Sequence, residues 1–279
     1  MLPSKAHRMS ENLASPGIPL PELIPLVDEP ASGTATNAPP PKPDFRTRAD
    51  LDLFQEQMGR SGSYEELRDC LHSLGWINRL TLAYRPTFRW LKAVYAQSPK
   101  SSRPLHLVDV GCGYGDFLRR VHRWARRRRL PIVLTGIDLD PNAIRAAREA
   151  TPPDMVTYII GNAYDFHPPE GIDLVVSSLL THHLRTPEII QFLQWMEGNA
   201  RVGWFINDLH RQEIPYRLFN LLTSIPVWHP LIGPDGLVSI LRSFRPEDWQ
   251  QLLREAHLPA DACEIQTFRP ARLCVSRLR

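Results

Sequence analysis

The stretch LHLVDVGCGYGDF, residues 105–117, decides how this chain folds. Residues 105–110 are mostly apolar, as in a buried strand, and Gly111, Gly113 and Gly115 follow at alternate positions. Residues without a β-carbon let the backbone turn sharply and approach a ligand closely. Helical spacing of apolar residues begins at residue 116 and continues to 129, so the glycines mark a turn into a helix whose N-terminus favours an anionic group.

Strands and helices alternate on the C-terminal side of this turn. Further strands are predicted at residues 131–138, 155–160, 172–178 and 202–207, and helices at 141–150 and 187–197. This alternation predicts an α/β fold with a doubly wound parallel sheet. Residues 208–245 interrupt it and are expected to form a helical insertion. A helix at 246–256 follows, and the last segments, ACEIQTF and RLCVSRL, predict an antiparallel strand pair that completes a seven-stranded sheet.

Two different segments precede the first strand. Residues 1–44 are rich in Pro, Ser, Ala and Thr, and we expect a disordered tail, with a ligand for a proline-recognising domain as the alternative. Residues 45–103 have helical periodicity and predict two or three helices. One domain is therefore expected over residues 45–279, with a core at 104–279.

Composition restricts the classes of partner and compartment. The 33 basic and 30 acidic side chains give a formal charge of +3, which does not favour nucleic acid as a partner. Proline or charge interrupts the apolar runs near the N-terminus, so no transmembrane segment is expected. The four cysteines form no CxxC pair, and a cytoplasmic location is predicted. Oligomeric state is left open.

Polar residues at the ends of two later strands complete a candidate ligand site. Asp138 ends the second strand, beside the glycine turn, and its carboxylate can accept hydrogen bonds from both hydroxyls of a ribose. Asn162 and Ala163 follow the third strand, where an amide carbonyl and a backbone N–H can read an adenine. Three strand ends thus predict one adenosyl ligand.

These motifs resemble class I methyltransferases, which have a Rossmann-like fold, over roughly residues 104–279. The resemblance implies S-adenosylmethionine as cofactor, bound by the loop of Gly111, Gly113 and Gly115. It implies that Asp109 braces the loop, that Asp138 binds the ribose, and that Asn162 and Ala163 contact the adenine. The remaining cofactor contacts that it implies are Cys112, Leu139 and Ser178.

Four further segments resemble bacterial methyltransferases associated with type III polyketide synthases. The segments are residues 77–80 (INRL), 180–184 (LTHHL), 207–211 (NDLHR) and 236–244 (GLVSILRSF). This closer resemblance implies O-methylation of a small hydrophobic aromatic or polyketide-derived hydroxyl. C-methylation of a quinone precursor remains an alternative within enzymes, and a catalytically silent binding module is the alternative outside them.

His182 and His183 follow the fourth strand, where an acceptor would meet the methyl group. Histidine can take a phenolic proton near neutral pH, so one of the pair is a candidate base. His183 is preferred because, together with Leu184, it resembles the histidine–hydrophobic pair that many class I methyltransferases carry after the fourth strand. The alternative is that these imidazoles only hold a loop. Asp208 ends the fifth strand and could face the same pocket or pair with Arg211.

Three absences narrow the chemistry. Residues 177–180, SSLL, contain no Asn/Asp/Ser-Pro-Pro-aromatic box of the nucleic-acid amino methyltransferases, and no Pro-Cys nucleophile is present in that region. Magnesium prefers oxygen ligands, and the two serines at 177–178 supply no acidic ones. We therefore expect no metal ligands. The aromatic residues expected to wall the pocket are Trp76, Phe88, Tyr216, Phe219 and Trp228.

Overall fold

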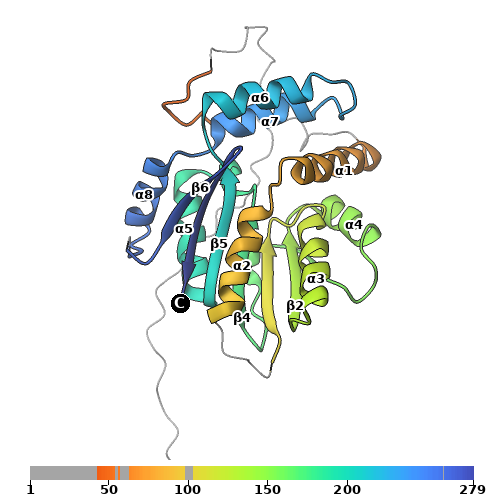
Figure 1. Ribbon diagram of the computed structural model, residues 1–279, viewed down its shortest axis with the longest axis vertical. Coiled ribbons are helices and arrows are strands. Elements are labelled where there is room, and N and C mark those ends of the chain that lie inside the picture. The colour runs from red at the N-terminus through yellow and green to blue at the C-terminus, as the bar shows by residue number, and fades with distance from the viewer. Residues whose placement is uncertain (1–42, 54–55, 57–62, 98–102, 260) are drawn as a thin grey trace, which may run out of the picture. The chain divides into compact units, whose positions relative to one another are not determined.

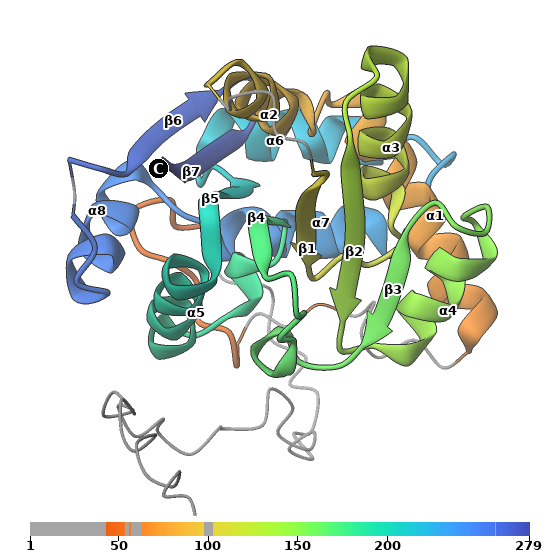
Figure 2. The ribbon, with the colours of Figure 1, turned by 90° about the horizontal axis from the view of Figure 1, so that it is seen from below.

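The computed structural model describes residues 43–53, 56, 63–97, 103–259 and 261–279. Seven strands form one sheet in the order β3-β2-β1-β4-β5-β7-β6 (Figures 1 and 2). Strands β1 to β5 pair in parallel, whereas β7 is antiparallel to both β5 and β6. The strands are β1 (Leu105–Val110), β2 (Ile132–Asp138), β3 (Thr157–Ile160), β4 (Ile172–Ser178), β5 (Ala200–Leu209), β6 (Glu264–Phe268) and β7 (Arg272–Leu278). The predicted sheet and its C-terminal strand pair are confirmed.

Helices cover both faces of the sheet because its central strands are apolar on both sides. On one face, α2 (Arg85–Gln97), α3 (Asp116–Arg128) and α4 (Pro141–Glu149) bury side chains such as Leu91, Leu118 and Ile144. On the other face, α5 (Thr186–Asn199) and α8 (Pro246–Glu255) bury Leu193 and Trp249. The sheet is therefore the middle of three layers.

Three more helices lie beyond the carboxyl ends of the central strands (Figure 1). They are α1 (Tyr64–Leu80), α6 (Glu213–Thr223) and α7 (Ile232–Arg242). Cys70 and Ile77 of α1 pack against Ile232 of α7. Helices α6 and α7 form the insertion predicted after the fifth strand, and α1 and α2 are the predicted N-terminal helices.

The predicted tail, residues 1–44, lies outside the described residues except for positions 43 and 44. Its disorder stays a prediction. In the part of the chain that the structure describes, no helix has the length and apolar character needed to cross a membrane.

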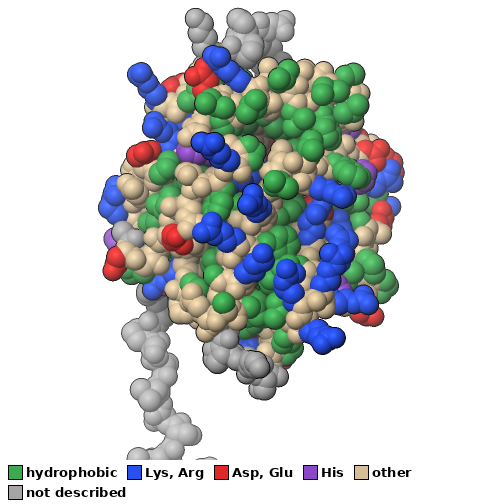
Figure 3. All heavy atoms as spheres, viewed as in Figure 1, with side chains coloured by type: hydrophobic (Ala, Val, Ile, Leu, Met, Phe, Trp, Pro, Cys, Tyr) green, Lys and Arg blue, Asp and Glu red, His purple; other side chains and the backbone are tan. Residues whose placement is uncertain are grey.

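Many of the basic side chains gather on the face that carries α2 and α3 (Figure 3). Arg126, Arg127 and Arg128 are exposed in the last turn of α3. Cations at a helix C-terminus interact favourably with the helix dipole. This interaction is a sufficient structural reason for three consecutive arginines at this position.

Gly136 lets β2 pack closely against the turn after β1. A β-carbon at this position would lie 2.8 Å from Cys112 Sγ, 2.8 Å from Leu118 Cδ1 and 2.9 Å from Tyr158 Cδ1. Real β-carbons do not come this close to other heavy atoms, so glycine is required by packing here.

We expect Gly136→Ala to lower the free energy of unfolding by about 1–3 kcal/mol, because the buried neighbours must shift to admit one methyl group. Gly198→Ala is the matched control, since Gly198 lies in α5 with no heavy atom near its β-position. It should raise stability by about 0.5–1 kcal/mol. Urea unfolding followed by circular dichroism measures both, and equal effects would contradict the packing argument.

Candidate active site

The glycine turn after β1 has an unusual backbone that only glycine adopts easily. Gly111, Gly113 and Gly115 have φ values of 71°, 48° and 68°. A β-carbon at Gly115 would overlap the hydroxyl of Tyr158, whereas one at Gly113 would meet nothing within 4 Å. The turn is thus packed against the protein at Gly115 and borders open space at Gly113, which lets a ligand approach its backbone.

Asp138 lies beside this turn, as predicted. Its Oδ2 accepts a hydrogen bond from the N–H of Gly113 at 2.8 Å, and its Oδ1 accepts from the N–H of Asp140 at 3.0 Å. Burial raises the pKa of this carboxyl, although the two backbone hydrogen bonds oppose the shift. A carboxylate has about four acceptor positions, so two remain for a ligand. Asp138 therefore holds the loop and can also bind a ligand.

Asp109 differs from its expected role as the brace of the loop. The N–H groups of Gly111 and Cys112 bond instead to the carbonyl of Ile137, at 2.9 and 3.1 Å. Asp109 is 2% exposed, and its Oδ1 has no partner among the described residues. Burial, followed by the nearby Asp116 and Asp138, raises its pKa well above the ordinary value. The parallel strand β2 braces the turn, and Oδ1 of Asp109 is a buried acceptor that no described residue satisfies.

A buried polar chain that the sequence did not reveal lies next to Asp109. The Tyr84 hydroxyl donates a hydrogen bond to Asp116 Oδ2 at 2.8 Å. The same hydroxyl accepts a hydrogen bond from Asn78 Nδ2 at 3.1 Å. Arg272 Nη2 donates to Asn78 Oδ1 at 3.2 Å. This chain links the start of α3 to α1 and β7. Sequence spacing gives no signal for it, because its members are far apart along the chain.

Asn162 uses its carbonyl locally. Its Oδ1 accepts from the N–H of Tyr164 at 3.0 Å and so caps the short helix η2 (Ala163–Asp165). Asn commonly bonds to the backbone two residues later, which explains this turn. The oxygen predicted to contact an adenine therefore already accepts one local hydrogen bond and has a second lone pair for a ligand. Ala163 is buried at the same strand end, and Leu139 is 44% exposed.

The segment after β4 connects the glycine turn with the two histidines. Leu179 has a φ of 60°, an uncommon value for a residue with a side chain. Leu180 covers Gly111, where a β-carbon would lie 3.0 Å from Leu180 Cδ1. The next three residues form η3 (Thr181–His183). Ser178, at the end of β4, has a buried hydroxyl with no partner in the described part of the chain.

Asp208 positions His182. The Nδ1 atom of His182 lies 2.7 Å from Asp208 Oδ1, and its backbone N–H donates to Oδ2 at 3.0 Å. The Thr181 hydroxyl donates to the same oxygen. Burial opposes ionisation of Asp208, but His182 and these hydrogen bonds together lower its pKa. Arg211 instead bonds to Asp248 at 2.9 Å, so the alternative of an Asp208–Arg211 pair was wrong.

Glu56 is the acidic residue that sequence reasoning missed. Its Oε1 lies 3.7 Å from His182 Nε2, and its Oε2 lies 3.8 Å from His183 Nε2. The two imidazole rings lie side by side, with centroids 4.2 Å apart. Arg48 holds the neighbouring chain by donating to the carbonyls of His182 and Leu184, at 3.1 and 2.7 Å. A segment before the first helix thus completes the site.

His183 is the more accessible histidine, with a side chain that is 38% exposed compared with 3% for His182. Although part of this side chain reaches solvent, the protein atoms packed around it remove enough water to lower its pKa well below the ordinary value, and the neighbouring His182 and Arg242 lower it further. At neutral pH its imidazole is therefore uncharged and offers a nitrogen lone pair.

Cys112 is buried within the glycine turn, and burial raises its pKa well above the ordinary value. The thiol is thus protonated at neutral pH, so Cys112 fills space within the turn and is not a nucleophile.

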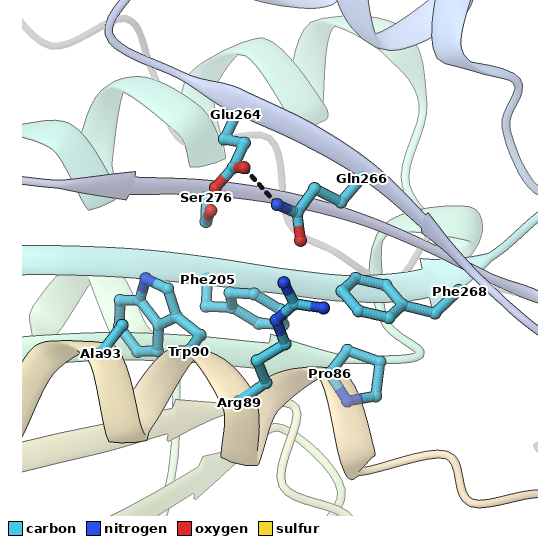
Figure 4. Close-up of a pocket in the computed structure, with 9 residues that line it drawn as sticks. All are labelled: Pro86, Arg89, Trp90, Ala93, Phe205, Glu264, Gln266, Phe268 and Ser276. Atoms are coloured by element: carbon cyan, nitrogen blue, oxygen red, sulfur yellow. Dashed lines mark hydrogen bonds between the residues drawn. The ribbon is translucent and has the colours of Figure 1, made fainter.

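Of the five aromatic side chains predicted as pocket walls, Phe219 and Trp228 pack against the cluster of Cys70, Ile77 and Ile232, and Phe88 and Tyr216 contact other rings. Phe88 contacts Phe117 and Trp124 of α3, and Tyr216 contacts Phe45. Trp76 is half exposed. A pocket lies between α2 and the C-terminal strands and contains no predicted site residue (Figure 4). It is lined by Pro86, Arg89, Trp90, Ala93, Phe205, Glu264, Gln266, Phe268 and Ser276.

Comparison with known proteins agrees with this architecture. Residues 107–225 match a family described as methyltransferase domain. The chain is similar to the plantazolicin methyltransferase BpumL in complex with SAH, with 18% identity over 81% of this chain and 99% of that chain and a TM-score of 0.51. It is also similar to LepI in complex with SAM, with 18% identity, 68% of this chain covered and a TM-score of 0.49. This match spans 46% of the LepI chain.

A third similar structure is magnesium protoporphyrin IX methyltransferase from Synechocystis PCC 6803 with bound SAH, with 13% identity over 71% of this chain and 83% of that chain and a TM-score of 0.48. No curated protein matches the chain. The likeness to BpumL shows the fold. Residues 107–225 are the part of this chain that is similar to a methyltransferase domain.

Proposed function

We propose that this protein transfers a methyl group from S-adenosylmethionine to a hydroxyl of a small aromatic or polyketide-derived molecule. One observation carries the proposal: Leu180 packs on the glycine turn, and the histidines that follow it face Glu56 and Asp208. A ligand over the turn would therefore lie close to side chains that can activate a hydroxyl.

The residues at the turn fit the proposed cofactor. Gly113 borders open space, and Asp138 keeps two acceptor positions for ribose hydroxyls. Among the described residues, Asp109 Oδ1 and Ser178 Oγ are buried without a hydrogen-bond partner, which is costly unless a ligand satisfies them. When bound, S-adenosylmethionine would supply a methyl group on a cationic sulfur. The acceptor would give an electron pair to the methyl carbon, and the electrons of the broken carbon–sulfur bond would remain on sulfur.

The protein's own contribution is orientation and help with loss of the acceptor's proton. Alignment in a dry site supplies much of the rate of such transfers. A phenol must also lose its proton, and the uncharged imidazole of His183 offers a lone pair for this step. Its greater exposure makes His183, and not the buried His182, the histidine that an acceptor reaches more easily.

The substrate class is supported by where the resemblance segments lie. Residues 180–184 and 207–211 meet through Asp208 and His182. Residues 236–244 reach the same place, because the Ser239 hydroxyl donates to Glu56 Oε1 at 2.6 Å. Three of the four segments that resemble methyltransferases associated with type III polyketide synthases therefore surround one cluster, as expected if they recognise a related acceptor.

Asp138→Ala should weaken binding of S-adenosylmethionine by about 1–3 kcal/mol, because the ribose loses charge-assisted acceptors and Gly113 loses its partner. Isothermal titration calorimetry measures the change. Asp140→Ala is the control: it removes the cap of α4 at Asn142, lowering stability by about 1 kcal/mol, and leaves cofactor affinity unchanged. Full affinity in Asp138→Ala would remove this residue from the site.

His183→Ala should bind cofactor normally and lose about a hundredfold in turnover on a phenol. The loss should shrink as the pH approaches about 10, where the phenol ionises unaided. A rate–pH profile with product identification checks this, and His167→Ala, an exposed site outside the cluster, is the control. A defect that does not change with pH would indicate that His183 only positions the acceptor.

A further inference from the structure

Three potential metal-binding side chains converge from two distant segments of the chain. The donor atoms of Glu56, His182 and His183 all lie within 4.8 Å of one another. Glu56 precedes α1, whereas the histidines follow β4. The set of two imidazoles and one carboxylate is one that divalent transition metals select.

The distances between these atoms are too long for hydrogen bonds and suit a shared ion. The separations of 3.7 and 3.8 Å exceed the roughly 2.7–3.2 Å of an N–H···O bond. Two ligand atoms that each lie about 2.1 Å from one ion are about 3.0–3.6 Å apart, depending on the coordination angle. The two histidine–glutamate pairs are thus close to the separation of two ligands on one ion, and the complete set of three donor atoms lies within 4.8 Å.

The histidine nitrogens that face Glu56 have lone pairs to offer. The bond between Nδ1 and the ionised Asp208 places the proton of His182 on that nitrogen, so Nε2 is the acceptor. A carboxylate that holds the far nitrogen of an imidazole is the usual support for a metal-binding histidine. Neither Nε2 has a recorded hydrogen bond among the described residues.

The surrounding charges leave one oxygen of Glu56 available. Ser239 donates to Oε1 at 2.6 Å, and Arg242 Nη1 lies 3.6 Å from the same oxygen. Arg242 forms an ion pair with this oxygen and is the cation that competes with a metal, so the metal is expected on the other oxygen, Oε2. Oε2 faces His183 and has no recorded hydrogen bond in the described part of the chain.

We propose that Glu56, His182 and His183 bind one divalent transition-metal ion, such as Zn²⁺. The sequence expectation of no metal ligands considered only residues after the fourth and fifth strands and so did not include Glu56. The inference rests on the proposed function and deepens it: the ion would hold the acceptor's hydroxyl oxygen and lower its pKa. The hydroxyl proton would pass to water, and His183 would act as a ligand instead of taking the proton itself.

The test uses the full chain, freed of metal by chelation and dialysis. Zn²⁺ is titrated by calorimetry, and Co²⁺ by its visible absorption, with Mg²⁺ as the control because it prefers oxygen ligands. We expect about one Zn²⁺ or Co²⁺ per chain and no comparable binding of Mg²⁺. His183→Ala and Glu56→Gln should each weaken Zn²⁺ binding at least tenfold, and His167→Ala should not.

Two further measurements distinguish failure of the metal site from failure of the protein to fold and from failure of the proposed function. The melting temperature of each metal-free variant shows whether it folds, and Glu56→Gln decides the question if His183→Ala does not. Titration of the metal-free protein with S-adenosylmethionine tests the proposed function independently. Absence of Zn²⁺ binding, or equal binding by the wild type and both variants, would overturn the metal site and leave the methyltransferase proposal standing. Metal binding without binding of S-adenosylmethionine would support the metal site and overturn the proposed methyl transfer.

Discussion

The turn from β1 into α3 requires a left-handed backbone at three alternate positions, and the arrangement of the site depends on that requirement. Gly111, Gly113 and Gly115 meet it without strain. Their missing side chains also leave room for Leu180 on one side of the turn and for Tyr158 on another. The carbonyl of Ile137 and the carboxylate of Asp138 then fix the turn by accepting its N–H groups. The second strand therefore shapes the loop as well as supplying the carboxylate that we propose binds the ribose.

Asp208 fixes the segment that carries the two histidines, as Ile137 and Asp138 fix the glycine turn. It is fully buried and ionised, and it accepts hydrogen bonds from the Thr181 hydroxyl and from His182. A buried carboxylate is stable only when such donors surround it. Its partners are therefore held in one geometry, which orients the Nε2 atom of His182 toward Glu56. The chemistry proposed for the acceptor depends on this orientation.

The N-terminal segment and the C-terminal strands both support this site from outside the central sheet. Arg48 bonds to the carbonyl of Arg242 at 2.7 Å and to those of His182 and Leu184, so it joins α7 to the histidine segment. Burial lowers its pKa to about 10, which still leaves it charged at neutral pH. On the other side, Arg272 of β7 reaches Asp116 through Asn78 and Tyr84. The elements added to the parallel sheet thus fix the positions of the groups around it.

The sequence by itself determined the alternation of strands and helices, the glycine turn, the nearby Asp138 and the position of the histidines after β4. These features are local: apolar periodicity, glycine spacing and strand ends are readable within a few residues. It did not determine the partners of Asp109, Asn162 and Asp208, because each hydrogen bond depends on which face a side chain occupies and on competing local donors. Glu56 and the chain from Asp116 to Arg272 came only from the tertiary structure. Their members are far apart in sequence, and only packing of the N-terminal segment, the helical insertion and β7 around the sheet brings them within reach of one another.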